Sequence, residues 1–142
     1  MAAMEPLCIL IGLDPKKFTK EENQLLEAEL FRKICDELKG IMRQEYKQYF
    51  EMMKFNKDQE DTMLEETFLQ NILNHIISSG KYTAHGIAFY TDMHVDVIDE
   101  LTSGRNTKPT ALCFRKIMEV DREVRTELYQ AIGKKIAVEL KN

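Results

Sequence analysis

Histidine, cysteine and carboxylate side chains are the groups with which this chain could catalyse a reaction or hold a metal ion. The histidines and cysteines are His75, His85, His94, Cys8, Cys35 and Cys113. They are too scattered to form a recognisable metal-ligand pattern. No motif pairs two acids for acid–base chemistry, and the six glycines are isolated rather than gathered in a phosphate-binding loop. The sequence therefore predicts no catalytic residue, no metal site and no cofactor, and it disfavours an enzyme.

The single histidines and cysteines have simpler interpretations. His75 lies in an apolar helical pattern, which favours a partly buried structural residue over a ligand. Cys113 falls on the inward side of its helix and is predicted to lie in the core. His85 and His94 are predicted to be exposed, where they could hydrogen-bond a phosphate or titrate near neutrality. An odd number of widely spaced cysteines is not a disulfide framework and favours a reducing cytoplasm.

Charged side chains between residues 94 and 116 provide a different chemistry, the attraction or repulsion of another macromolecule. Spacing of i, i+3, i+4 and i+7 places four polar residues on one helix face: Asp96, Asp99, Glu100 and Ser103. Four cations follow, with no acid in residues 104–116: Arg105, Lys108, Arg115 and Lys116. A polyanion is repelled by the first group and attracted by the second. Asn106 and Thr107 add neutral hydrogen-bonding groups to the second.

The composition limits any contact with nucleic acid to a small patch of the surface. The chain has 142 residues, of which 44% are hydrophobic, enough for a folded core. Its formal net charge is −4, from 20 basic and 24 acidic residues. Since the whole chain is not attracted to phosphate, a nucleic-acid footprint must be a small patch. The apolar run at residues 7–13 is too short to span a membrane, and a buried short strand or extended arm is expected there.

The first part of the chain is predicted to be a long helix. Thr19 and Glu22 form a capping-box pattern, and a wide apolar stripe follows to about residue 55. Gly40 is the expected position of a bend or break. The end of the stripe predicts core, a dimer contact or an exposed apolar patch, formed by Tyr46, Tyr49, Phe50, Met52 and Met53. Residues 1–60 are thus interpreted as an N-terminal arm and a long helix that could dimerise.

Shorter helices are predicted in residues 61–142, after a polar linker at residues 56–61. Thr62 and Glu65 repeat the capping-box pattern before a strongly periodic apolar run, and Gly80 is placed as a helix stop. Two further helices are expected after residue 110. No long alternating run predicts a sheet, so the fold class is all-α with about six helices.

Residues 83–104 predict two short helices that meet at a tight turn. Thr83 is a good cap for the first helix, which runs to about Tyr90. The residues Thr-Asp-Met that follow suit a corner, and a second helix starts near His94 and ends at Gly104. Two short helices joined in this way form a helix-turn-helix.

The ordered set of residues in this segment resembles the Cro and lambda-repressor type of helix-turn-helix domain. The matching positions are Thr83, Ile87, Ala88, Met93, Ile98, Leu101, Gly104, Arg105 and Pro109, followed by Leu112, Phe114 and Ile117. The resemblance covers roughly residues 64–120 and does not explain residues 1–60. It implies a compact five-helix domain whose second short helix lies in the major groove of DNA, usually as a dimer on a two-fold site.

The segment departs from the family at the positions that the resemblance assigns to DNA contact. The base-reading positions are Val95, Asp96 and Glu100, and Ala84 stands where the family usually has a phosphate-binding Gln. A carboxylate can accept a hydrogen bond from a cytosine amine, worth about 1–3 kcal/mol of discrimination, but it cannot replace phosphate contacts. Arg105 and Lys108 lie where the family's loop runs beside the DNA backbone.

Two functions follow as hypotheses. The first is a DNA-binding transcriptional regulator of bacterial or phage type. It binds double-stranded DNA as a homodimer, with the long N-terminal helix and the last helix as the dimer contact. Its predicted DNA-binding residues are Thr83, Ala84, His85, His94, Val95, Asp96, Asp99, Glu100, Ser103, Arg105, Asn106 and Lys108. The second is a protein-interaction module on the same scaffold, whose acidic face binds a basic partner. Neither hypothesis involves a membrane.

Overall fold

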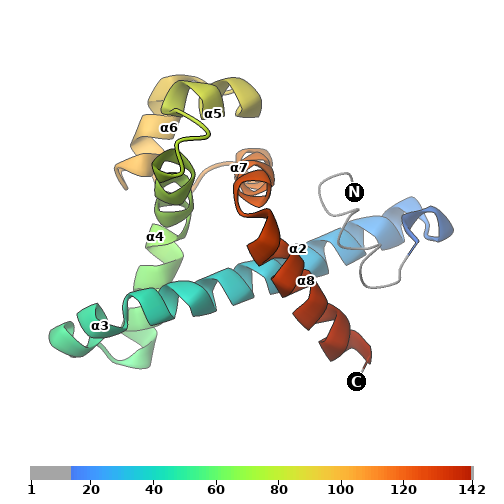
Figure 1. Ribbon diagram of the computed structural model, residues 1–142, viewed down its shortest axis with the longest axis horizontal. Helices are drawn as coiled ribbons and strands as arrows, with labels where there is room; N and C mark the ends of the chain where they lie inside the picture. The colour runs from blue at the N-terminus through green and yellow to red at the C-terminus, as the bar shows by residue number, and fades with distance from the viewer. Residues whose placement is uncertain (1–13, 142) are drawn as a thin grey trace. The chain divides into compact units, whose positions relative to one another are not determined.

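The computed structural model describes residues 14–141, and these residues are helical throughout their regular parts (Figure 1). After a short 3-10 turn at Pro15–Lys17, seven α-helices follow in chain order. They are α2 (Lys20–Glu45), α3 (Lys47–Met53), α4 (Lys57–Ser78), α5 (Ala84–Thr91), α6 (Val95–Thr102), α7 (Ala111–Val124) and α8 (Thr126–Lys141). The predicted all-α class is confirmed for the described residues, none of which lies in a strand. The strand or arm expected at residues 7–13 lies outside them.

The helices form two compact units. Among the described residues, one comprises residues 14–41 and 127–141, and the other comprises residues 42–126. The functional division predicted at residue 60 stays a prediction. None of the helices in residues 14–141 has the length and apolar character needed to cross a membrane.

The first unit contains most of α2 and nearly all of α8. The predicted capping box is present: the Glu22 N–H donates to Thr19 Oγ1 at 3.1 Å, and the Thr19 N–H donates to Glu22 Oε1 at 3.0 Å. The same carboxylate–backbone bond lowers the pKa of Glu22. Lys135 of α8 forms a 2.9 Å ion pair with Glu37 of α2. Within this unit, the buried hydrophobic residues of the two helices are Leu30, Ile34, Cys35, Leu38, Tyr129, Ile132 and Ile136.

The expected break at Gly40 is wrong in its position. Gly40 lies inside α2, and the break between α2 and α3 lies instead at Tyr46, which has a φ of −95° and a ψ of 8°. The Tyr46 hydroxyl donates to Asn71 Oδ1 of α4 at 2.8 Å. A tertiary hydrogen bond thus accompanies the break at Tyr46. A glycine, in contrast, only lowers the free-energy cost of interrupting a helix.

The predicted start of α4 at Thr62 is also wrong. The helix begins at Lys57, and its capping box is formed by Asn56 and Gln59. Thr62 is already helical there, and its hydroxyl donates to the Asp58 carbonyl at 2.9 Å. Residues 56–61 are therefore the first turn of the helix rather than a linker.

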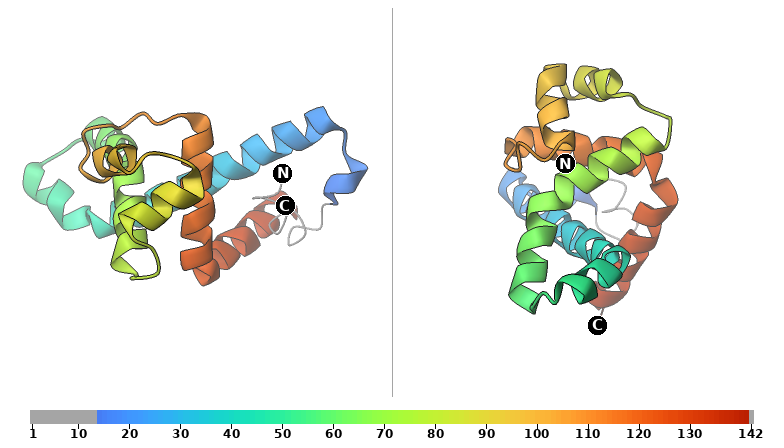
Figure 2. Two further views of the ribbon diagram at one scale, coloured as in Figure 1. Left: turned by 90° about the horizontal axis from the view of Figure 1, so that it is seen from above. Right: turned by 90° about the vertical axis from the view of Figure 1, so that its left-hand side faces the viewer.

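The second unit is built on α4. Its buried face consists of Leu64, Phe68, Leu69, Ile72, Leu73 and Ile76. Both α6 and α7 pack on α4, and α5 packs on α6 and α7. Figure 2 shows α5 and α6 next to one another at the C-terminal end of α4. The Phe68 ring stacks on Phe114 of α7 with centroids 5.8 Å apart. These contacts fix the base on which the two short helices lie.

Candidate nucleic-acid interface

The first short helix, α5, is held at both ends by local hydrogen bonds. Thr83 caps it as predicted, because its Oγ1 accepts from the Gly86 N–H at 3.0 Å. Ile87 and Ala88 are buried. The helix ends at Asp92, which has a φ of 55° in the left-handed region. The Met93 N–H then reaches back to the Ala88 carbonyl at 2.9 Å, and the chain turns sharply.

The second short helix, α6, begins where the sequence predicted. His94 is its N-cap, and its Nδ1 accepts from the Asp96 N–H at 3.1 Å. Ile98 and Leu101 are both buried, so this helix does turn Ile98 inward. Gly104 has a φ of 80° and follows the last turn. A Cβ added to it would meet the Gln70 side chain at 3.0 Å, so a glycine suits this position for both its φ and its size.

Two tyrosines hold the α5 region against α7. The Tyr82 hydroxyl donates to Glu123 Oε2 at 2.7 Å, and the Tyr90 hydroxyl donates to Glu119 Oε2 at 3.2 Å. The bond to Glu123 raises the pKa of Tyr82, and burial followed by the charge of Glu119 raises the pKa of Tyr90. Neither tyrosine was singled out from the sequence, because its partner lies 41 or 29 residues away.

The predicted polar face of α6 is exposed in the structure. All four of its residues lie at the surface: Asp96, Asp99, Glu100 and Ser103. Asp96 Oδ2 lies 3.4 Å from His94 Nδ1. Among residues 14–141, the carboxylates of Asp99 and Glu100 make no ion pair or hydrogen bond. Two carboxylates on this face are therefore unneutralised by the described part of the chain.

The loop after α6 has exposed cationic side chains, and hydrogen bonds hold its backbone in place. Arg105 and Lys108 are exposed. Arg105 Nε donates to Ser103 Oγ at 3.0 Å. The Asn106 N–H donates to the Glu100 carbonyl at 3.1 Å, and Asn106 Oδ1 accepts from the Lys108 N–H at 2.9 Å. Asn106 thus positions the loop, and Arg105 and Lys108 are the groups of this loop able to attract an anion.

The remaining predicted site residues lie around the ends of the two helices. Thr83 uses its side-chain oxygen as the cap. Ala84 and Val95 are half-buried, and His85 and His94 are exposed as predicted. The two short helices and the turn between them therefore bring the whole predicted set to α5, α6 and the adjoining loop, while their contact with DNA stays a prediction.

Phe89 is a candidate contact residue that the sequence interpretation missed. It is 91% exposed, on the outer face of α5. It lies four residues after His85, which was predicted to be exposed. Because residues i and i+4 lie on the same face of a helix, this spacing could have predicted that Phe89 is exposed too. A large exposed aromatic ring of this kind is typical of contact surfaces rather than of cores.

The remaining histidine and cysteine predictions concern His75 and Cys113. The His75 side chain is 43% exposed and therefore partly buried, and its Nε2 lies 3.7 Å from Glu45 Oε2. Cys113 is buried as predicted, and that burial raises the pKa of its thiol. No group of three or more potential metal ligands occurs among residues 14–141.

Comparison with known proteins identifies no relative from which a family or a function could be assigned. No protein-family model matches the chain, and neither a curated protein nor a solved structure is detectably similar to it.

Proposed function

We propose that the chain is a DNA-binding transcriptional regulator that binds DNA as a homodimer, with α5 and α6 as the helices that contact the DNA. The observation that carries the proposal is the pair of short helices joined by a left-handed turn at Asp92, with Ile87, Ala88, Ile98 and Leu101 buried. This is the architecture with which many proteins place a helix in the major groove. The resemblance of residues 64–120 to Cro and lambda-repressor domains points the same way.

In this proposal α6 enters the groove and the loop after it grips the DNA backbone. Arg105 and Lys108 are exposed on an ordered loop, so they can bind phosphates without first being organised. Asp96, Asp99 and Glu100 oppose binding by repelling the backbone. They restrict the helix to sites where a carboxylate accepts from a cytosine amine. Binding is therefore expected to be weak on random sequence and selective for particular sites.

The finer architecture is part of the same proposal. Both α6 and α7 contact α4, and α5 contacts α6 and α7, which supports assigning α4 to α7 to the first four helices of the five-helix domain that the resemblance implies. The fifth helix would be α8, although residues from Glu127 onward group with the other unit.

Charge reversal tests the phosphate contacts. Arg105→Glu and Lys108→Glu should each weaken binding to mixed genomic duplex fragments in an anisotropy titration. The logarithm of the association constant falls as the logarithm of the salt concentration rises. Each substitution should make this fall less steep, by about 0.9 in the slope for every phosphate that the variant no longer neutralises. Lys134→Glu on α8 is the matched control, because Lys134 is also exposed but lies outside the interface. An unchanged slope in the Arg105 and Lys108 variants, or an equal loss of affinity in the control, would remove the proposal.

A second candidate is a protein-interaction module that uses the same face. Two observations favour it: the unpaired carboxylates of Asp99 and Glu100, and the 91% exposure of Phe89 on the adjacent helix. Aromatic anchors beside complementary charge are common in protein interfaces. This candidate predicts no duplex binding even at low salt. It also predicts that Asp99→Asn with Glu100→Gln abolishes capture of a basic partner.

A further inference from the structure

Helix α3 exposes large apolar side chains, whereas the central apolar side chains of α2 and α8 are buried. The central apolar residues of those two helices are buried within a single chain, so a second chain cannot use them: Leu30, Ile34, Leu38, Tyr129, Ile132 and Ile136. On α3, in contrast, Tyr49, Met52 and Met53 are 38%, 75% and 49% exposed. Three large apolar residues within five positions form a patch of the kind that marks an interaction site.

The patch lies on a rigid aromatic base. The rings of Tyr49 and Phe55 meet edge to face with centroids 5.9 Å apart, and Phe50 lies 6.1 Å from each of them. The backbone turn after α3 is fixed by Lys54, which has a φ of 55°, and by the hydrogen bond from the Phe55 N–H to the Phe50 carbonyl. A preformed surface of this kind loses little conformational entropy when a partner binds.

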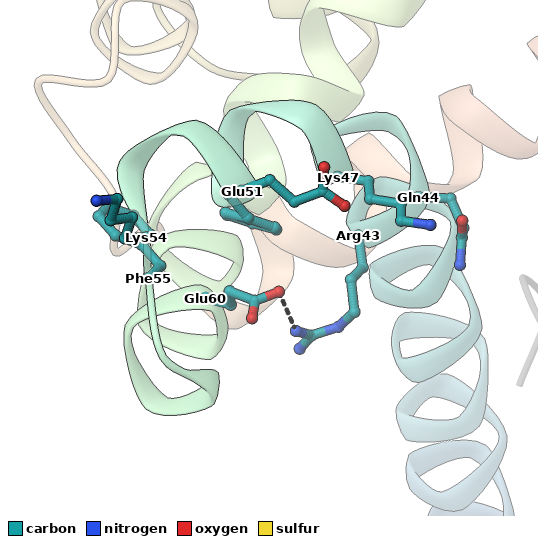
Figure 3. A pocket seen from close by; sticks show the side chains of 8 residues that line it. Arg43, Gln44, Lys47, Glu51, Lys54, Phe55 and Glu60 are labelled. Carbon is teal, nitrogen blue, oxygen red and sulfur yellow. Dashed lines mark hydrogen bonds and ion pairs between the residues drawn. The ribbon is translucent and has the colours of Figure 1, made fainter.

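Two hollows border this base and share Phe55 in their linings. The first, of about 360 Å³, is shown in Figure 3: Lys47, Glu51 and Lys54 line it from α3 and its C-cap, and Glu60 lines it from α4. The second, of about 430 Å³, is lined by Tyr49, Phe55 and Met63 together with Asp58, Gln59, Thr62 and Glu66.

The two hollows carry opposite charge. The first hollow is lined by three cations, Arg43, Lys47 and Lys54, and by two acids, Glu51 and Glu60, so its lining has one excess positive charge. Arg43 pairs with Glu60 and with Asp61, which lies outside the lining. The charged residues of the second hollow are both acids, Asp58 and Glu66. Within residues 14–141, none of the four residues Lys47, Lys54, Asp58 and Glu66 forms an ion pair. An apolar centre with a basic hollow and an acidic hollow beside it is complementary to a second copy of itself.

We infer that the corner formed by α3 and the start of α4 is the contact surface of a two-fold homodimer. Lys47 and Lys54 of one copy face Asp58 and Glu66 of the other, and the contact occurs twice by symmetry. Tyr49, Met52 and Met53 of both copies form the apolar centre. The inference rests on the homodimer of the proposed function and assigns its surface.

Two complementary sets of charge reversals test this surface. The first variant carries Lys47→Glu and Lys54→Asp, and aspartate is chosen at the second site because it tolerates the left-handed backbone. The second variant carries Asp58→Lys and Glu66→Lys. Each should raise the dimer dissociation constant at least about tenfold in sedimentation equilibrium, because like charges then meet across the interface. An equimolar mixture of the two should restore association, since every contact is again between opposite charges.

Two further measurements make the outcome decisive. Met52→Glu should also abolish association, whereas Leu112→Glu, at a 65% exposed apolar residue of α7, should leave it unchanged. Circular dichroism checks that each variant is folded. A wild-type chain that stays monomeric at every concentration, or a mixture that associates no better than its components, overturns the inference.

The dimer and the DNA proposal fail in different ways. A monomer that binds duplex DNA with an Arg105-dependent salt slope overturns this dimer surface and leaves the helix-turn-helix proposal standing. A dimer that dissociates in the charge-reversed variants but never binds duplex DNA supports the surface and removes DNA binding.

Discussion

The Tyr82 hydroxyl donates a 2.7 Å hydrogen bond to Glu123, which joins the residue before the N-cap of α5 to α7 across 41 residues of sequence. This bond and the parallel bond from Tyr90 to Glu119 hold α5 in place. The position of α6 follows from that of α5, because the two helices pack on one another.

The Tyr82 bond predicts a loss of stability in alkali. The folded protein raises the pKa of Tyr82, chiefly through the bond to Glu123. The stabilisation is therefore fully present below the tyrosine's ordinary pKa of 10.0 and is lost as the pH rises through the higher folded value. Urea unfolding at pH 7 and above pH 10 should show this loss in the wild type and a smaller loss in Tyr82→Phe. Tyr49→Phe removes a hydroxyl that makes no hydrogen bond among residues 14–141, so this variant should behave as the wild type.

The His94 cap predicts that α6 depends on an acceptor at this position. His94→Ala removes the acceptor for the Asp96 N–H and should lower the free energy of unfolding by about 1 kcal/mol. His94→Asn supplies an amide oxygen and should retain the stability. Urea denaturation of the two variants provides the comparison. If the alanine variant is as stable as the asparagine variant, the cap does not stabilise α6.

The turn between the short helices predicts a preference for glycine at Asp92. With a φ of 55°, the backbone there is in a region that a Cβ disfavours. Asp92→Gly should therefore be more stable than Asp92→Ala by about 1 kcal/mol in thermal or urea unfolding. The same pair of substitutions at Gln24, an exposed position inside α2, should show the opposite order by about 1 kcal/mol. A shared order at both positions would contradict the left-handed turn.

The ion pair between Arg125 and Asp121 predicts a large effect from removing one partner. Asp121 is fully buried, and its two carboxylate oxygens accept from Arg125 at 2.8 and 2.6 Å. Arg125→Ala leaves this carboxylate without its guanidinium and should lower the free energy of unfolding by about 3 kcal/mol. Replacing both residues by leucine should recover part of the loss, because no buried charge is then left unpaired. Equal stability of Arg125→Ala and the wild type would show that Asp121 is satisfied by other groups.

Local signals in the sequence predicted the short helices well. Thr83, His94 and Gly104 each act on backbone within a few residues, and the buried positions of Ile98 and Leu101 follow from spacing alone. Such features do not need knowledge of the rest of the fold.

Competition between local signals explains the errors. Thr62 with Glu65 has the same pattern as the true capping box at Thr19 and Glu22, but the box at Asn56 starts the helix first. A capping pattern shows that a helix can start at a residue, and a better cap upstream overrides it. The interruption at Tyr46 accompanies a contact with Asn71, 25 residues away, and no local pattern encodes that contact.

The polar site was predicted as a set of exposed residues, and the exposed apolar residue beside it was missed. Phe89 is a large hydrophobic residue, and a hydrophobic residue in a helical pattern is assigned to a core by default. For Met52 and Met53 the sequence left core, dimer contact and exposed patch open, and both are exposed. Only tertiary packing determines which apolar residues the core leaves at the surface.

The central claim is that the face made by α5, α6 and the Arg105 loop binds double-stranded DNA. The most direct test is an anisotropy titration of the wild-type chain against mixed genomic duplex fragments at low and moderate salt. The account predicts measurable binding at low salt that weakens steeply as salt is added, because released counterions drive the contact. Absence of binding at low salt, or binding that salt does not change, would contradict it.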